Sequence, residues 1–260
     1  MKWLSCEETS IGQVYECDPY GNNPSKVLPA LGRFKHEAVA EDFLKKHLYL
    51  TEDTPDGGFY RFIPDSLTKE GNIDFSSGKL QIAVLNGDNQ EGKIEWENIK
   101  EPNPPIWQIL LKINELRYQV KNSAKFNGGE GIAYYQGKIY FATKGDNKIW
   151  CYETKTQNLI VLYNHSEHPN PILSGVDNIV FSSSGDLFVA EDGGDMQIVA
   201  INSEGGLFPI LQIEGQDESE ITGPAFDPSN ERLYFSSQRG KSGNSSNGIT
   251  YEVKGPFNSI

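Results

Sequence analysis

Residues 187–205, LFVAEDGGDMQIVAINSEG, carry the pattern that decides the fold. A β-rich run leads into a polar pair, a glycine-containing turn and a second β-rich run, which is typical of a β-hairpin. Four similar stretches are WLSCEETSIGQVYECDP from Trp3, LYLTEDTPDGGFYRFIPD from Leu48, YFATKGDNKIWCYETKT from Tyr140 and YFSSQRGKSGNSSNGITYEVKG from Tyr234. The chain is therefore an array of related β units.

The five copies recur at a nearly constant spacing. The first residues of their polar pairs are Glu7, Glu52, Lys144, Glu191 and Gln238. The steps are 45, 92, 47 and 47 residues, so one further unit is expected between residues 54 and 139. Repeats of four short strands at this spacing are typical of β-propellers. We predict an all-β fold, with residues 1–260 forming a single six-bladed β-propeller domain.

The first and last units are shorter than the others. The first begins without a preceding strand, and the last ends after its third strand. Either the propeller is incompletely closed or the chain is a fragment of a longer protein.

A helical insertion is predicted for residues 104–121. The run PPIWQILLKINELRYQV opens with two prolines and then repeats apolar residues at helical spacing. These apolar residues are Ile106, Ile109, Leu110, Ile113 and Leu116. Because apolar stripes usually face a core, we expect the helix to pack over a blade rather than to bind a partner.

Composition limits the classes of function. The 260 residues are 37% hydrophobic and 23% charged, as in a soluble globular protein, and no apolar run approaches the roughly 18 residues of a membrane span. A net charge of −13 disfavours nucleic acid and membrane surfaces and favours bound cations. The three cysteines form no C-x-x-C pair, which predicts neither a disulfide framework nor a thiolate zinc cage. Since no large apolar stripe suggests a dimer, a monomer is predicted.

Candidate metal ligands begin the first strand of several units. In a propeller these strands line the central channel, so Glu37, Glu130 and Asp177 are predicted to converge at one mouth. Converging carboxylates repel and raise one another's pKa values unless a cation neutralises them, and all-oxygen sites suit Ca²⁺. Glu220, which begins the equivalent run in the last unit, is a further candidate. The alternative is that these are solvated turn carboxylates.

Two other side chains have alternative interpretations. Cys6 is either a small buried hydrophobe or a ligand for a transition metal. His36, next to Glu37, is either a ligand or a polar strand residue. The sequence contains no Ser-His-Asp order, Walker loop or H-E-x-x-H motif, so catalytic triads and nucleotide folds have no support.

Six segments resemble the PhoX-type alkaline phosphatases and their relatives. In order they are WLSCEE (3–8), LPALGRFKHEA (28–38), LYLTEDTPDGGFYRF (48–62), EGIAYYQGKIYFATKGDN (130–147), VDNIVFSSSGDLFVAEDGG (176–194) and ITGPAFDPSNERLYFSSQRG (221–240). The resemblance extends over nearly the whole chain. It implies a six-bladed propeller with a calcium and iron (Fe³⁺) cluster at one end of its channel, which hydrolyses small phosphomonoesters.

The resemblance also implies roles for individual residues. Cys6 resembles the thiolate ligand of iron, Glu37, Glu130 and Asp177 resemble carboxylates that bridge iron and calcium, and Glu7 is a further neighbour of the metals. Several cations there would bind phosphoryl oxygens and neutralise the charge of the transition state. Family members are mostly exported, which implies a periplasmic or extracellular location.

One departure concerns the phosphate clamp. In the family, an arginine stands two positions before the glutamate of the EG motif, and this chain has Gly128 there. Lys144, Arg33 or Arg239 would have to supply the positive charge. With Glu130, we count Lys144 and Arg33 as candidate catalytic residues.

Two other functions stay open at this point. One is a calcium-dependent lactonase of the gluconolactonase and regucalcin type, which would bind Ca²⁺ without iron and would not use Cys6. The other is a non-catalytic calcium-binding propeller.

Overall fold

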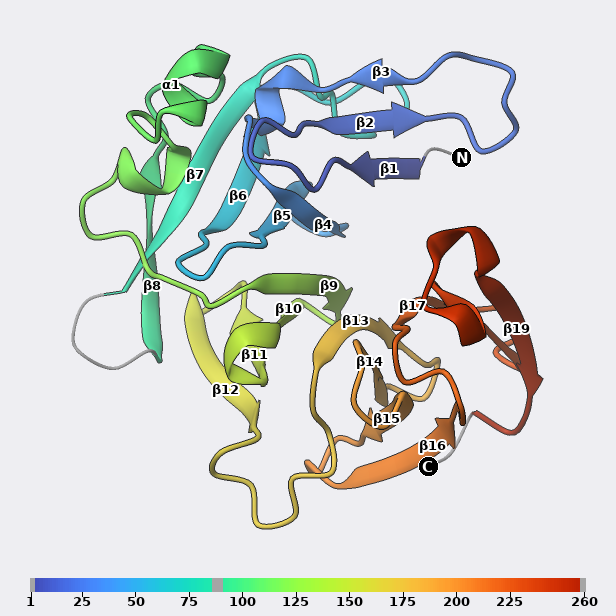
Figure 1. The fold of residues 1–260 in the computed structure, drawn as a ribbon. Coiled ribbons are helices and arrows are strands. Elements are labelled where there is room, and N and C mark those ends of the chain that lie inside the picture. Colours follow the sequence, from blue (N-terminus) through green and yellow to red (C-terminus); the bar gives the residue numbers. More distant parts are fainter. Residues whose placement is uncertain (1–2, 86–90, 258–260) are drawn as a thin grey trace. The chain divides into compact units, whose positions relative to one another are not determined.

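Antiparallel β-strands make up most of the protein, as the repeat predicted. The computed structural model describes residues 3–85 and 91–257. Its strands are β1 (Trp3–Cys6), β2 (Val14–Cys17), β3 (Lys26–Val27), β4 (His36–Asp42), β5 (His47–Glu52), β6 (Phe59–Pro64), β7 (Gly78–Leu85), β8 (Gly92–Asn98), β9 (Gly129–Tyr135), β10 (Lys138–Thr143), β11 (Lys148–Glu153), β12 (Asn158–Asn164), β13 (Val176–Phe181), β14 (Leu187–Glu191), β15 (Gln197–Ile201), β16 (Leu207–Gln212), β17 (Ile221–Phe226), β18 (Arg232–Ser237) and β19 (Ile249–Lys254) (Figure 1).

Helices are few and short among the described residues. They are α1 (Ile106–Leu110) and the 3-10 helices η1 (Pro29–Leu31), η2 (Leu116–Tyr118), η3 (Lys144–Asp146), η4 (Gly240–Ser242) and η5 (Ser245–Asn247). Within residues 3–85 and 91–257, no helix has the length and hydrophobicity needed to cross a bilayer.

The chain divides into two compact units. Unit 1 comprises Met1–Ile139 and Cys151–Ile160, and unit 2 comprises Tyr140–Trp150 and Val161–Ile260. The boundary passes through β10, β11 and β12, so these strands contribute residues to both units. The prediction of a single domain is not tested by this division.

Unit 1 contains two sheets of strands that follow one another along the chain. β1, β2 and β3 form one antiparallel sheet, and β4 to β8 pair in sequence order in another. β9 lies against β4 and β5. Between residues 54 and 139, β7 and β8 extend the sheet of β4 to β6 rather than forming a separate sheet. The sixth repeat unit expected in this region is therefore not confirmed.

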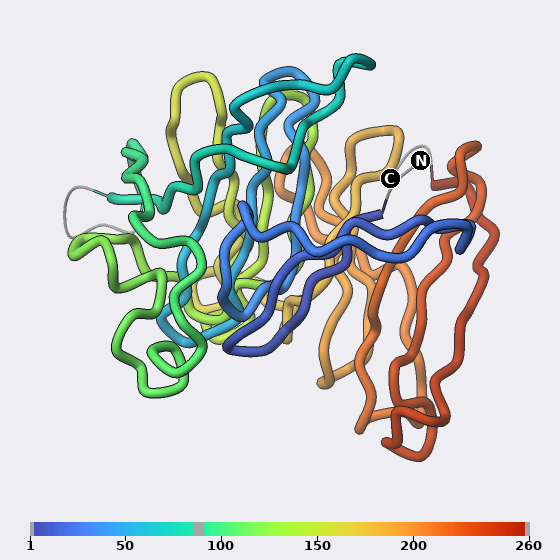
Figure 2. Tube along the Cα trace, turned by 90° about the horizontal axis from the view of Figure 1, so that it is seen from above, coloured from blue at the N-terminus to red at the C-terminus, as the bar shows by residue number. Residues whose placement is uncertain are grey.

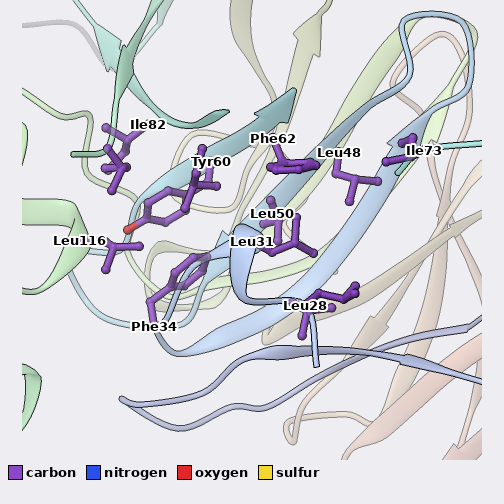
Figure 3. Close-up of a cluster of buried hydrophobic side chains, with 13 residues drawn as sticks. Leu28, Leu31, Phe34, Leu48, Leu50, Tyr60, Phe62, Ile73, Ile82 and Leu116 are labelled. Carbon is purple, nitrogen blue, oxygen red and sulfur yellow. The ribbon is translucent and has the colours of Figure 1, made fainter. Parts of the chain in front are cut away.

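The core of unit 1 brings together side chains from several of these elements. Its side chains point toward one another between β5, β6, β7 and η1 (Figure 3). The residues labelled there are Leu28, Leu31, Phe34, Leu48, Leu50, Tyr60, Phe62, Ile73, Ile82 and Leu116. Burying such side chains stabilises a domain by about 1.5–3 kcal/mol each. The core fixes β4 and β5, which carry candidate site residues at their ends.

The helix expected over residues 104–121 is present only in part. α1 ends at Leu110, and Lys112 adopts a left-handed conformation (φ 55°) that turns the chain away from a helical path. Residues 100–125 follow an irregular looping path, drawn in green in Figure 2. Of the predicted apolar stripe, Ile109 and Leu116 are buried. The other members are exposed, so only part of the stripe packs as expected.

Unit 2 contains two further antiparallel sheets in sequence order. One consists of β13 to β16 and the other of β17 to β19. β17 lies against β13 and β14, and apolar side chains from both sheets share one core. The buried members of that core are Phe188, Ala190, Met196, Ile198, Ala200, Ile221, Leu233, Phe235 and Phe257. These modules of short, consecutively paired strands make the fold propeller-like.

Candidate functional site

A register break occurs near the beginning of three first strands. Where β4 pairs with β5, the register shifts after His36, so Glu37 lies in the irregular stretch. The shift between β13 and β14 begins after Val176 and includes Asp177, and β17 has one after Thr222. Bulges of this kind bend a strand and redirect its side chains, and they are common next to active sites. The same local irregularity therefore recurs at Glu37 and Asp177, two of the predicted candidate positions.

The polar-pair glutamates close the hairpin turns. Each accepts a hydrogen bond from the backbone N–H six residues further along the chain, over 3.0 Å at Glu7, 2.8 Å at Glu52 and 2.9 Å at Glu191. The turns are tight: a Cβ atom at Gly57 would lie 2.2 Å from the carbonyl oxygen of Glu52, and one at Gly12 would lie 1.9 Å from that of Glu7. Stabilising its own turn is therefore one structural role of each of these glutamates, including Glu7.

These turns lie at the same sheet ends as the candidate carboxylates. Glu52 pairs with His36, which precedes Glu37, and Glu191 pairs with Val176, which precedes Asp177. Within each of these sheets, the turn therefore lies at the end that carries the candidate carboxylate.

In unit 1, two predicted carboxylates and the predicted thiol lie close together. Carboxylate oxygens of Glu37 and Glu130 lie within 4.8 Å of each other, and Glu130 is only 2% exposed. Burial, with a further contribution from the negative charge of Glu37, raises the pKa of Cys6 to about 12. Without a cation, the Cys6 side chain is therefore a neutral thiol at neutral pH.

Thr51 joins the strands that carry these carboxylates. Its buried hydroxyl donates a 2.6 Å hydrogen bond to the backbone carbonyl of Glu130 on β9. The same oxygen accepts a 3.2 Å hydrogen bond from the backbone N–H of Ala38, next to Glu37 on β4. One hydroxyl thus links the backbones beside Glu37 and Glu130.

His36 and Arg33 have defined structural contacts. His36 is fully buried, its Nε2 lies 3.2 Å from the carbonyl oxygen of Gly32, and its ring lies 3.5 Å from that of Phe34. Burial lowers the pKa of His36 to about 3, so the ring is neutral. Arg33 is half-buried, and its guanidinium donates a 3.3 Å hydrogen bond to the side chain of Gln13.

Unit 2 gathers three carboxylates and two cations at the equivalent sheet ends. Oxygens of Asp177, Asp192 and Glu220 all lie within 4.8 Å of one another. Lys144 Nζ lies 3.6 Å from Asp177 and 3.1 Å from Asp192, while the Arg239 guanidinium lies 3.4 Å from Asp192 and 3.3 Å from Glu220. Three negative charges thus share two positive ones. Sequence reasoning included Asp177, Glu220 and Lys144, but it missed Asp192.

The crowding of these carboxylates changes their acidity. Burial, then repulsion by Asp192 and Asp177, raises the pKa of Glu220 to about 7, although Arg239 opposes the shift. Burial also raises the pKa of Asp177, and Lys144 partly offsets that effect. Bound cations would relieve both penalties.

A buried ionic network in unit 1 was also missed by sequence reasoning. Arg117 forms 2.9 Å ion pairs with Glu52, Asp56 and Glu115. Glu52 additionally accepts a 2.7 Å hydrogen bond from the Tyr60 hydroxyl. The network fixes residues 115–117 against the turn between β5 and β6. Arg117 lies 61 positions from Asp56 and 65 from Glu52, so no local pattern indicates these two pairings.

A comparison with known protein families identifies the family of this chain. The family model described as alkaline phosphatase PhoX matches residues 4–171, which is more than half of the chain. The chain belongs to the PhoX alkaline phosphatase family. No curated protein matched the chain.

Solved structures resemble this PhoX family member in fold. A chain of a nidogen/laminin complex is 15% identical, with a TM-score of 0.51, and the match covers 90% of this chain and 70% of that one. A gluconolactonase from Xanthomonas campestris is 14% identical, with a TM-score of 0.44 and coverage of 90% and 64%. A glutaminyl cyclase from Myxococcus xanthus is 11% identical, with a TM-score of 0.43 and coverage of 86% and 76%. At these identities the likeness concerns fold alone.

The PhoX match includes some candidate residues and ends before others. Cys6, Glu37, Glu130 and Lys144 lie within residues 4–171. Asp177 lies beyond its end, as do Asp192 and Glu220. The carboxylate and thiol group of unit 1 is therefore the part of the candidate site that the family match covers.

Proposed function

We propose that this protein is a metal-dependent phosphomonoesterase that acts on small phosphorylated substrates. The observation that carries the proposal is the approach of Glu37 and Glu130 to within 4.8 Å, with Cys6 close enough to Glu37 for its pKa to respond. These residues lie inside the region that matches the PhoX family. The proposal includes a six-bladed ring, which the 92-residue step between hairpins supports, and a monomer.

The residues fit the calcium and iron that the family implies. A cation would stabilise this set of a neutral buried thiol and two carboxylates, because it favours the thiolate and the ionised carboxylates. Thiolate suits iron, and carboxylate oxygens suit calcium. We assign Cys6, Glu37, Glu130 and Asp177 as ligands in this proposal, with Glu7 and Glu220 as further neighbours. The hydrogen bond that Glu7 makes in its own turn supports an indirect role for Glu7.

Bound cations of this kind supply Lewis acidity, which neutralises charge on phosphoryl oxygens. The chain's own residues have separate tasks. Glu37 and Glu130 hold negative charge on a rigid frame, because Thr51 ties together the backbones of β4 and β9. Within unit 2, Lys144 and Arg239 hold positive charge next to Asp192 and are the groups that would bind a phosphoryl oxygen.

The backbone at Gly128 explains why this chain needs another cation for that purpose. Gly128 is buried and has a φ of 70°, in the left-handed region that favours glycine. An arginine at this position would be strained. Positive charge must therefore come from elsewhere, and Lys144 and Arg239 are better candidates than Arg33 because the two lie together around Asp192.

Hydrolysis of an aryl phosphate by protein loaded with calcium and iron tests the proposal. We expect Glu130→Gln to lower the rate by about a hundredfold or more, because it removes a charged group at the reaction centre. Glu97→Gln is the matched control, because Glu97 is exposed on β8. An inactive wild-type enzyme, or equal rates for Glu130→Gln and Glu97→Gln, contradicts the proposal.

Metal content separates this function from a non-catalytic calcium-binding propeller, which the glycine at position 128, in place of the family's arginine, favours. Elemental analysis is expected to find calcium and iron, with iron lost in Cys6→Ala and retained in Cys17→Ala. Cys17 is the matched control because it is also a free, half-buried cysteine. Calcium alone, indifferent to Cys6, would instead support the non-catalytic propeller or a calcium-dependent lactonase.

A further inference from the structure

The segment of residues 100–125 exposes an unusual number of large apolar side chains. The exposed side chains are Ile106 (44%), Trp107 (58%), Leu110 (61%), Leu111 (65%), Ile113 (63%) and Tyr118 (52%). We call these six residues the apolar patch. At about 200 Å² for a large side chain, they expose roughly 700 Å², which is more than the roughly 300–600 Å² of the largest patch on a typical soluble monomer. A surface of this kind indicates a binding function.

The patch is held in place mainly by neighbouring residues of the segment, and within the patch the Tyr118 hydroxyl donates a hydrogen bond to Asp56. Ile109 and Leu116 are buried and anchor the segment from within. Arg117 is fixed by its three ion pairs, and Gln119 donates a 2.9 Å hydrogen bond to the backbone carbonyl of Glu101. The exposed apolar side chains are therefore presented on a rigid support.

The charge of the segment is opposite to that of the chain. Residues 100–125 contain five basic and two acidic residues, whereas the whole chain has a net charge of −13. Lys100, Lys112, Lys121 and Lys125 are all exposed. Of the two acidic residues, Glu115 is already paired with Arg117. Arg117 is buried and balanced by its own three carboxylates, so the positive charge exposed on the segment comes from these four lysines, with Glu101 and Asp56 as the nearby opposing charges.

We propose that residues 100–125 bind an anionic lipid surface, with the apolar patch entering the interface. Tryptophan, tyrosine and leucine are typical of interfacial contacts, and lysines around them attract anionic headgroups. The area favours this occupant over a second copy of the chain, because a stable protein pair buries about 800 Å² on each partner. The predicted exclusion of membrane surfaces rested on the total charge, which does not describe this segment.

Co-sedimentation of the full chain with vesicles tests the proposal. Binding is expected to an equal mixture of phosphatidylglycerol and phosphatidylcholine, and to be at least about tenfold weaker with phosphatidylcholine alone. Trp107→Ser/Leu111→Ser and Lys112→Glu/Lys121→Glu are each expected to weaken binding about tenfold or more. Leu67→Ser/Lys69→Glu is the matched control, because it changes an exposed leucine and an exposed lysine elsewhere in unit 1.

Tryptophan fluorescence identifies the inserted side chain. The emission of the wild type is expected to shift to the blue on adding anionic vesicles, and Trp3→Phe should keep this shift because Trp3 lies outside the patch. Trp107→Phe should lose it. Absence of binding to anionic vesicles, or binding that neither double variant weakens, overturns the proposal. So does a dimer in solution that Trp107→Ser/Leu111→Ser dissociates, since the patch would then bind a second copy. These readouts do not depend on phosphatase activity.

Discussion

Replacing Arg117 with methionine should strongly destabilise unit 1. Arg117 is the shared cation of Glu52, Asp56 and Glu115, each at 2.9 Å. Methionine keeps the unbranched apolar stem but removes all three ion pairs. Asp56 can be solvated after the change, because its side chain is 39% exposed, whereas that of Glu52 is only 1% exposed.

The buried carboxylate sets the size of the effect. Removing one partner of a buried ion pair costs about 3–5 kcal/mol, because the other charge is left without compensation. For a chain of this length, 1 kcal/mol lowers Tm by about 2–4 °C. The expected fall in the Tm of Arg117→Met is therefore about 6–20 °C.

Thermal unfolding at two pH values measures both the loss and its cause. Burial already raises the pKa of Glu52, and Arg117 opposes that shift. Without Arg117 the pKa of Glu52 rises further, so the folded variant keeps a proton on Glu52 that the unfolded chain releases. A folded-state pKa above the unfolded value gives stability that is lost as pH rises. The difference between variant and wild type should accordingly be smaller near pH 5 than near pH 8.

A comparison with Arg232→Met decides whether the reasoning is right. Arg232 pairs with Glu252 at 3.3 Å, but both side chains are 46% exposed, and such surface pairs contribute about 0–1 kcal/mol. The double variant Glu52→Gln/Arg117→Met should recover part of the lost stability, since no buried charge remains. An Arg117→Met variant that is no less stable than Arg232→Met would refute the account.

Three further predictions concern the candidate site. Thr51→Val should cost about 1–3 kcal/mol of unfolding free energy, because it removes the hydroxyl that bonds the backbone N–H of Ala38 and the backbone carbonyl of Glu130. Urea unfolding measures this loss, and an unchanged midpoint contradicts it. Because the pKa of Glu220 is raised to about 7, the Tm of metal-free protein should fall as pH rises through that value. Glu220→Gln should reduce this fall, and an unaltered fall in the variant contradicts the prediction. In metal-free protein near pH 8, Cys6 should react with iodoacetamide far more slowly than Cys17, as mass spectrometry of the labelled peptides will show, since the pKa of the Cys6 thiol is about 12. Equal labelling of the two cysteines would rule out the burial argument.

The repeat in the sequence predicted the β modules because strand alternation and turn residues are local properties. The hairpin from Leu187 is β14 and β15, and the one from Leu48 is β5 and β6. The further unit that the spacing predicts between residues 54 and 139 is not confirmed, because two strands there extend an existing sheet. Which neighbour a strand pairs with depends on tertiary contacts, and no period in the sequence encodes it.

The helix at residues 104–121 illustrates a different limit. Apolar residues at helical spacing also occur when a segment is partly buried without being helical, and Ile109 and Leu116 are the buried members here. The positive φ of Lys112 ends the helical path, although lysine itself is a good helix former. Instead, the ion pair between Arg117 and Glu52 and the hydrogen bond from Gln119 to Glu101 hold the segment. Both contacts join residues that are not neighbours in the sequence.

At the site, sequence reasoning identified charges but not their partners. It grouped Glu37, Glu130 and Asp177 by their position in the repeat, and the register breaks at two of them give that grouping a structural basis. It did not find Asp192, because that residue belongs to a polar pair rather than to a first strand. The glutamates of the polar pairs mostly close turns, so an acidic residue that recurs with the repeat is not by that fact a metal ligand.

The carboxylate clusters of the two units differ in the charges that a bound cation would meet. In unit 2, Lys144 and Arg239 already supply two positive charges to Asp177, Asp192 and Glu220, so a metal ion there must compete with ammonium and guanidinium groups. In unit 1, burial is the main cause that raises the pKa of Cys6, the negative charge of Glu37 adds to it, and a cation would favour the thiolate. A metal ion would therefore meet fewer competing cations on the side of Cys6, which is also the side inside the PhoX match. Loss of metal should for this reason affect the reactivity of Cys6 before it affects the ion pairs of Lys144.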